Sequence, residues 1–465
     1  MNIQDLLCEP TVSPAAVALG PTNPPAVETK TRRNFEEYPR AAALDWELMP
    51  HEADEAEEHF QRLQMEQTRL FSNSHHMIDV LESSSDAAVD EPRKYSFTNV
   101  DKLEEHLLSR DKALIRHVFI EADDSPSPLN CSVSMLKCVL AYEQVPPAFL
   151  KAVYAFGDRP GDLADAGLAS FGRHSRTYRG HTEASENVHL SCEWYLVRSF
   201  EKRQGDVMHS RDWPWLPRQM AVYHSFNHEN GRSFFLTIRG NGLFRKQIQA
   251  RRSLLASPPV KGPHAQREAA LQTALTTHLM YLSWCCRHWG QFIDDVRTMV
   301  WEFLIPTRTR PRALDREPEE VGTPGLGAIL TKITFRDLQN MNGHADYLRN
   351  ALLNLTETGR IVRSMTCVPF SWARTPASTG SKASISRFSC ELQSFAATIE
   401  VAEDQLRALA AELGQGIELH KKGLDLRVWH EQQQLENKGH SILQKSPIKA
   451  EDAEPGLASV DDSGS

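Results

Sequence analysis

The 465-residue sequence has few cysteines and no secretory signal. None of its eight cysteines forms a Cys-x-x-Cys pair, and the N-terminal segment MNIQDLLCEP has neither a basic start nor an apolar run. These absences exclude a disulfide-stapled secreted domain and predict buried, reduced thiols. We therefore expect a reducing compartment and a cytoplasmic protein. The cysteines are Cys8, Cys131, Cys138, Cys192, Cys285, Cys286, Cys367 and Cys390.

An excess of positive charge is also missing. The chain has 52 Lys and Arg against 61 Asp and Glu, which gives a formal net charge of −9. Phosphate binding needs a basic surface, so we do not expect nucleic acid as a partner. Apolar residues make up 40% of the chain, which is enough to bury a core and excludes wholesale disorder. At roughly 100–200 residues per domain, two to four units are expected.

No stretch of the sequence resembles a membrane span, which needs about 20 mostly apolar residues. The best candidate is Ala269–Cys286, and it is interrupted by glutamine, threonine and histidine. Its leucines, Leu271, Leu275, Leu279 and Leu282, form one stripe at helical spacing. We predict an amphipathic core helix here and expect that the chain as given does not cross a membrane.

Catalytic and metal-binding motifs are absent as well. There is no Gly-x-Ser-x-Gly, no His-Glu-x-x-His and no phosphate-binding loop of the Walker type. His224 and His228 are four residues apart, but they lie on a predicted strand, where that spacing does not bring two ligands together as it does on a helix. We predict no catalytic residue, no metal ligand and a non-enzymatic protein. Adjacent acids are interpreted as solvated surface: Asp123–Asp124, Asp294–Asp295 and Glu319–Glu320.

The pattern of elements predicts an α+β fold, with a small mixed or antiparallel sheet followed by a mainly helical C-terminal half. Arg116–Glu121 and Val188–Phe200 have the β-branched and aromatic content of strands. Two further strand-like runs within Gln219–Arg239 flank Asn230-Gly231, which favours a hairpin with a two-residue type I′ turn. Asp158–Glu186 is polar and is expected to be a loop.

We divide the chain by composition and periodicity. Residues 1–50 are proline-rich and are predicted to be a disordered tail, and an acidic helix with a linker follows over 53–82. The α/β domain is expected over 96–262 and a helical region over 264–440. An acidic disordered tail is predicted for 446–465.

The helix predicted over residues 388–413 has the clearest periodicity in the chain. Two apolar rows repeat every seven residues and are offset by four, which is the a/d pattern of a coiled coil. One interpretation is a core helix of a bundle, and the other is a homo-oligomer formed through 388–413. The rows are Phe388, Phe395, Ala402 and Leu409, and Leu392, Ile399, Leu406 and Leu413.

Three further motifs have a structural and a functional interpretation. Trp213-Pro214-Trp215 is predicted to plug the core where sheet meets helix, rather than to stack on a ligand. Gly240-Asn241-Gly242 is predicted to be a strand-to-helix turn, because a phosphate loop would need more glycines and a lysine. The basic residues of Phe244–Arg252 are interpreted as a solvated helix face, with binding to anionic lipid or to an acidic partner as the alternative.

The sequence resembles a fungal family at three places: Arg116–Glu121, Asn130-Cys131-Ser132 with the helix after it, and Asp212–Gly240. The text there is similar to the CorA-like transporter domain of filamentous-fungal proteins, and the resemblance covers roughly residues 96–440. The segment Thr334–Gln339 resembles the helical part of that family. The matching residues, which we interpret as a structural signature, are Asn130, Cys131, Trp213, Pro214, Trp215, Arg218, Gln219, Tyr223, His224 and Phe226.

The resemblance implies a CorA-like fold, but the two membrane helices and the Gly-Met-Asn motif of CorA channels are not found in this sequence. We therefore expect a soluble regulatory or scaffold module with an unidentified protein partner. The alternative is a divergent magnesium or metal-ion transporter of the CorA type without its membrane hairpin in this chain. No cofactor is predicted, and Mg²⁺ is implied by the resemblance alone. Carboxylate ligands must converge to hold Mg²⁺, and no cluster in the sequence forces this, so we predict no tight Mg²⁺ site.

Overall fold

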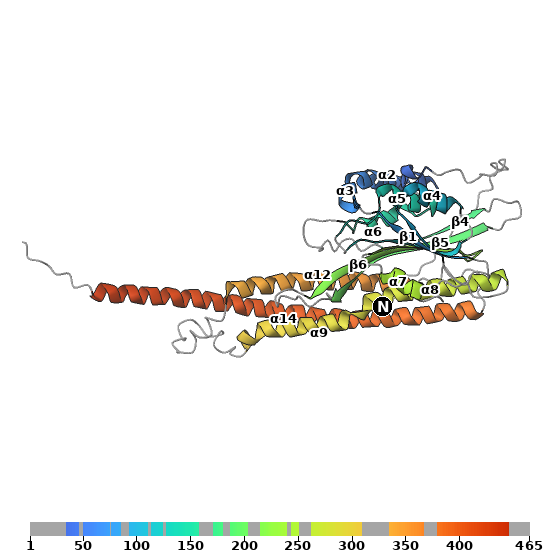
Figure 1. Cartoon of the computed structure of the whole chain (residues 1–465). Helices are drawn as coiled ribbons and strands as arrows, with labels where there is room; N and C mark the ends of the chain where they lie inside the picture. Colours follow the sequence, from blue (N-terminus) through green and yellow to red (C-terminus); the bar gives the residue numbers. More distant parts are fainter. Residues whose placement is uncertain are drawn as a thin grey trace, which may run out of the picture.

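The protein is described by a computed structural model in which one seven-stranded sheet lies between two layers of helices (Figure 1). The N-terminal helices cover one face of the sheet, and the long C-terminal helices cover the other. This arrangement confirms the predicted α+β class. The structure describes residues 34–45, 50–74, 76–84, 93–109, 113–123, 127–157, 171–179, 187–202, 214–239, 243–250, 262–308, 334–366 and 379–445.

The sheet is antiparallel except at its centre. Its strand order is β2-β1-β3-β7-β6-β5-β4, and the β3–β7 pair is parallel. The strands are β1 (Ile78–Ser84), β2 (Arg93–Phe97), β3 (Ala113–Ile120), β4 (Phe171–Arg179), β5 (Asn187–Lys202), β6 (Trp215–Asn227) and β7 (Ser233–Arg239).

The helices of the N-terminal layer are short. They are η2 (Phe35–Glu37), α1 (Arg40–Asp45), α2 (Pro50–Met65), α3 (Gln67–Leu70), α4 (Val100–Ser109), α5 (Val133–Tyr142), η3 (Pro147–Phe149) and α6 (Leu150–Val153). Helix α5 begins where predicted, because the Ser132 hydroxyl accepts a hydrogen bond from the Met135 amide, 3.2 Å away, and so caps the first turn. The buried side chains of α5 include Leu136, Val139 and Leu140. They belong to the core between the N-terminal helices and the sheet.

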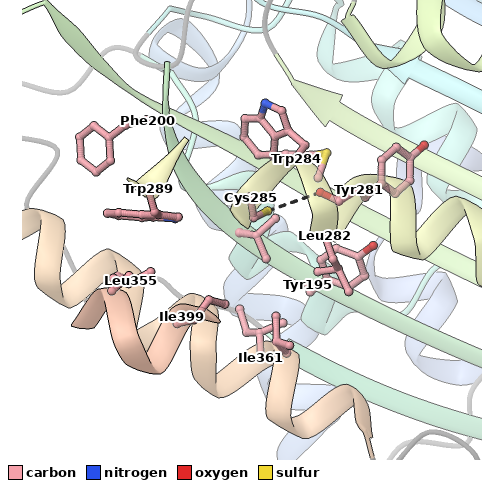
Figure 2. Close-up of a cluster of buried hydrophobic side chains, with 14 of the residues drawn as sticks. Tyr195, Phe200, Tyr281, Leu282, Trp284, Cys285, Trp289, Leu355, Ile361 and Ile399 are labelled. Carbon is pink, nitrogen blue, oxygen red and sulfur yellow. Dashed lines mark hydrogen bonds between the residues drawn. The ribbon is translucent and has the colours of Figure 1, made fainter. Parts of the chain in front are cut away.

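The C-terminal layer consists of α7 (Leu243–Ala250), α8 (Pro263–Arg287), α9 (Trp289–Arg308), α12 (Phe335–Thr366) and α14 (Thr379–Lys445). Figure 2 shows part of the core that they form with the sheet. Phe200 of β5 packs edge-on against Trp289 of α9, and Tyr195 of β5, Leu355 of α12 and Ile399 of α14 belong to the same cluster. No helix in the described part of the chain is long and apolar enough to cross a membrane.

The heptad rows of α14 are buried by helices of the same chain. Leu392, Ile399, Leu406 and Leu413 are each at most 1% exposed, and they belong to the core shared with α8, α9 and α12. The interpretation as a core helix is therefore confirmed for these side chains.

Helix α14 is much longer than the heptad segment, because the glycines at 414, 416 and 423 do not end it. At Gly416 the missing side chain permits close packing, since a Cβ there would lie 2.1 Å from Leu304 Cδ2 of α9.

The hairpin is confirmed, but its predicted turn is wrong. Five residues, His228–Arg232, connect the strands, and the Asn227 amide donates to the carbonyl of Arg232 at 2.8 Å. The Asn227 side chain accepts from the amides of Glu229 and Asn230, and Gly231 has the turn's one positive φ, 73°. A type I′ turn needs positive φ at both central residues, and Asn230 does not adopt it.

Several predicted boundaries are also wrong. Within the expected tail 1–50, residues 34–45 form η2 and α1, and Tyr38 is fully buried. Strands β1 and β2 both begin before residue 96, so the α/β unit begins earlier than predicted. Strand β4 lies inside the expected loop Asp158–Glu186. The tail predicted over 446–465 lies outside the described residues.

Candidate functional site

A row of polar side chains crosses the face of the sheet that α8 covers. The strand registers place Arg173 of β4 beside Glu193 of β5, and Glu193 beside His224 of β6. The row continues through Phe235 of β7 to His117 of β3. Residues paired across strands point to the same face, so this register alone brings one cation, one carboxylate and two imidazoles into line.

His278 of α8 completes a compact cluster above this row. Its Nε2 atom lies 2.9 Å from Nδ1 of His224 and 3.1 Å from Oε1 of Glu193. The three potential ligand atoms are all within 4.8 Å of one another. Glu193, His224 and His278 are 2%, 1% and 0% exposed, so the cluster lies wholly inside the protein.

The outward-facing nitrogen of each imidazole is held by a hydroxyl group. The Tyr195 hydroxyl lies 2.9 Å from His278 Nδ1, and the Ser233 hydroxyl lies 2.9 Å from His224 Nε2. Such contacts orient the rings and leave His224 Nδ1 and His278 Nε2 directed at Glu193. The ring of His224 is also stacked on Phe235, with centroids 4.1 Å apart, and His117 stacks on Phe235 at 4.8 Å.

Burial dominates the electrostatics of the cluster. It raises the pKa of Glu193 to about 7, against the opposing effect of the Arg173 guanidinium, whose nearest nitrogen is 3.7 Å from the carboxylate. Burial lowers the pKa of His278 to about 3, and it lowers the pKa of His224 well below its usual range, with His278 and His117 adding to the effect. Both imidazoles are therefore neutral at pH 7, which is the form that binds metal ions.

The Glu193 carboxylate is the unusual member of the cluster. Within the described part of the chain neither of its oxygens accepts a hydrogen bond. Its contact with His278 is close, but it lacks hydrogen-bond geometry. A buried carboxylate without hydrogen bonds is costly, so this group requires a cation or a proton.

Sequence reasoning found only one member of this cluster. His224 was predicted as a structural signature residue, whereas Glu193 and His278 carry no local signal. His278 is 54 residues from His224 and lies on a different element. His228, four residues from His224 on the same strand, contacts the Ser191 hydroxyl at 2.7 Å.

The other signature residues are spread over the fold rather than gathered at one site. Asn130 and Cys131 lie at the entrance to α5, where the Asn130 carbonyl accepts from the amide of Met77 at 2.7 Å. Gln219 donates to the carbonyl of Ala155, and Tyr223 is buried on the sheet face opposite His224. Arg218 lies 3.3 Å from Glu201, and Phe226 is buried beside α8.

Of the Trp213-Pro214-Trp215 motif, the structure describes Pro214 and Trp215, and Trp215 is part of the core. The Trp215 indole is 1% exposed, packs edge-on against Phe292, and donates to Asp295 at 2.9 Å. Pro214 precedes it at the start of β6, and Trp213 lies outside the described residues, as do Gly240–Gly242. Asp294 pairs with Arg297, so the Asp294–Asp295 pair does not act as one unit.

The basic helix α7 is partly engaged inside the protein. Arg245 forms ion pairs with Asp79 and with Glu121, the latter at 3.3 Å. Arg245 therefore pairs with acidic residues of the same chain rather than with an external anion. Arg251 and Arg252 lie outside the described residues.

Comparison with known proteins identifies the class to which this fold belongs. The family model for CorA-like transporters matches residues 30–305, which is more than half of the chain. The chain is therefore a member of the CorA-like transporter family, as the signature residues indicated. The match begins before residue 96, which agrees with the early strands β1 and β2.

Solved structures also align with the chain. One of them is the ZntB cytoplasmic domain from Vibrio parahaemolyticus RIMD 2210633, and the alignment covers 73% of this chain and 98% of that one. The sequence identity is 8% and the TM-score is 0.32, which is too low to equate the two folds. No curated protein matches the sequence.

Proposed function

We propose that this protein is a non-enzymatic regulatory or scaffold module of the fungal CorA-like kind, that it is cytoplasmic, and that it pairs with a second copy of itself through the distal part of α14. The observation that carries the proposal is the course of this 67-residue helix. Its proximal part packs on α8, α9 and α12, and its distal part extends past them (Figure 1).

The distal part of α14 exposes apolar side chains. Val428, Trp429 and Leu435 are 51%, 38% and 69% exposed. A helix gains most of its stability from packing an apolar face, so large apolar groups on an unpacked segment favour a partner.

The spacing of these residues favours a second copy as that partner. Val428 and Leu435 are seven residues apart, so they lie on one side of the helix at the spacing of a coiled-coil position. A globular partner would require a wider apolar face. Self-association was predicted through 388–413, but the apolar side chains there are already buried within the chain. We therefore propose the distal part of α14 as the self-association surface instead.

We expect the full chain to be a dimer or larger species at micromolar concentration, measured by size-exclusion chromatography with light scattering. Leu435→Asp and Trp429→Asp should each shift it to a monomer with unchanged helicity, because a charge among the exposed apolar side chains disfavours pairing but is tolerated in water. Val401→Asp is the matched control, since Val401 is 59% exposed on the proximal part of the same helix. A monomeric wild type, or pairing that survives both substitutions, would refute the proposal.

The second candidate function is that of a magnesium or metal-ion transporter of the CorA type, which the description of the matching family favours. Cell fractionation without detergent separates the two candidates. We expect the full chain in the supernatant after high-speed centrifugation. Recovery only in a carbonate-resistant membrane pellet would favour the transporter instead.

A further inference from the structure

We propose that Glu193, His224 and His278 bind one divalent transition-metal ion, with Zn²⁺ as the preferred species, in the core between the sheet and α8. The proposal is independent of self-association, since the cluster lies on a different part of the fold. The ligand atoms would be Oε1 of Glu193, Nδ1 of His224 and Nε2 of His278.

The donor set suits zinc better than magnesium. Zinc is bound by imidazole nitrogen and carboxylate oxygen at about 2.0–2.2 Å, and such bonds place neighbouring ligand atoms of a tetrahedron about 3.3 Å apart. The two close separations in the cluster are 2.9 Å and 3.1 Å. These two separations need shifts of only a few tenths of an ångström to admit the ion, and the third pair of ligand atoms lies within 4.8 Å. Mg²⁺ and Ca²⁺ prefer oxygen ligands alone, so the site discriminates against them.

The carboxylate supplies an independent reason for a cation at this point. Glu193 is 2% exposed, and neither of its oxygens accepts a hydrogen bond from any described residue. Arg173, the nearest cation, is 3.7 Å away and lies on the edge strand β4 rather than inside the cluster. A metal ion between the three groups would satisfy the carboxylate and both inward nitrogens together.

The surroundings of the two histidines match those of metal-binding imidazoles. The nitrogen that faces away from the site contacts a hydroxyl in each case, Tyr195 for His278 and Ser233 for His224. Outer contacts of this kind fix the tautomer and the ring orientation of a ligand. Metal binding requires the His278 proton to be on Nδ1, where the Tyr195 hydroxyl accepts it.

The alternative occupant of the cluster is a proton. In that arrangement Tyr195 donates to His278 Nδ1, and the Nε2–H of His278 donates to His224 Nδ1. Metal binding therefore moves the His278 proton from Nε2 to Nδ1. Nitrogen-15 spectra of the histidine rings distinguish the two tautomers.

The test is calorimetric titration of the full chain, freed of metal with a chelator, with ZnCl₂ and separately with MgCl₂. We expect one Zn²⁺ per chain at micromolar or tighter affinity and no comparable heat with Mg²⁺. Glu193→Gln keeps the shape of the side chain but removes its charge, and it should abolish the tight site, as should His224→Gln. Tyr195→Phe should weaken binding by roughly 10- to 100-fold through loss of the outer contact.

His117→Phe is the matched control, because His117 is buried in the same row and stacks on Phe235 but is not a ligand. It should leave the Zn²⁺ affinity unchanged. Tight binding that persists in Glu193→Gln and His224→Gln would place the ion on surface histidines and overturn the proposal, as would a wild type that binds no Zn²⁺.

Where the ligand variants do not fold, X-ray absorption of the zinc-loaded wild type decides the question. Two imidazoles in a shell of four or five ligands support the site. A shell of oxygen ligands alone overturns it.

Discussion

Leu406→Asp is expected to unfold the helical half of the protein. Leu406 is 0% exposed and lies in the core that α14 shares with α8, α9 and α12. An unpaired carboxylate at this position has no compensating cation or hydrogen bond, and burying it without one is prohibitive. Even Leu406→Ala, which only removes atoms, should lower the free energy of unfolding by about 2–5 kcal/mol.

The measurement is circular dichroism combined with light scattering. Leu406→Asp should lose helical signal and cooperative melting, whereas Val401→Asp, on an exposed side of the same helix, should retain both. A smaller species of unchanged helicity in Leu406→Asp would mean that the seam over 388–413 joins two chains instead of packing within one.

Acidification from pH 7 to pH 4 is expected to destabilise the metal-free protein. Burial lowers the pKa of His59 to about 4, of His117 to about 3 and of His228 to about 4. The folded state therefore keeps these rings neutral while the unfolded chain takes up protons near its pKa of about 6.5. Their contribution to stability is present above that value and is lost as the pH falls toward the folded pKa.

The protonation of Glu193 stabilises the folded protein at acid pH, which opposes the effect of the histidines. Its pKa is raised to about 7 by burial, so its contribution is present below the unfolded pKa of 4.5 and is lost as the pH rises through about 7. Three histidines outweigh this single carboxyl group between pH 6 and pH 5. Each net proton taken up on unfolding changes stability by up to about 1.4 kcal/mol per pH unit.

Urea denaturation with a chelator present, at several values between pH 7 and pH 4, measures this dependence. We expect the free energy of unfolding to decrease on the acid side, on the order of several kcal/mol in all. His117→Phe should reduce the slope by close to one proton. Equal stability at pH 7 and pH 5 would show that the buried imidazoles are charged in the folded protein.

Local pattern predicted the elements wherever a single segment determines its own structure. The helix predicted after Asn130-Cys131-Ser132 is α5, and Ser132 is its N-cap. The strands β3 and β5 also follow from their β-branched and aromatic content. These elements are set by periodicity and capping, which act between residues a few positions apart.

The predictions of secondary structure were wrong where pairing with a strand distant in sequence determines the element. Strand β4 lies in polar, glycine-containing text, and it is a strand because it pairs with β5 along its length. Strand β1 begins inside the segment 53–82, for which an acidic helix with a linker was predicted, and it is held between β2 and β3. Tertiary pairing overrode the weak local preference in both cases.

The sequence by itself determined the class of this protein: an α+β chain with the CorA-like signature and a heptad helix. It could not determine the Glu193–His224–His278 cluster, because no spacing relates residues on β5, β6 and α8. Strand register places Glu193 beside His224, and the packing of α8 on that face adds His278. Only the tertiary structure joins them, since side chains distant in sequence become neighbours through register and packing rather than through local periodicity.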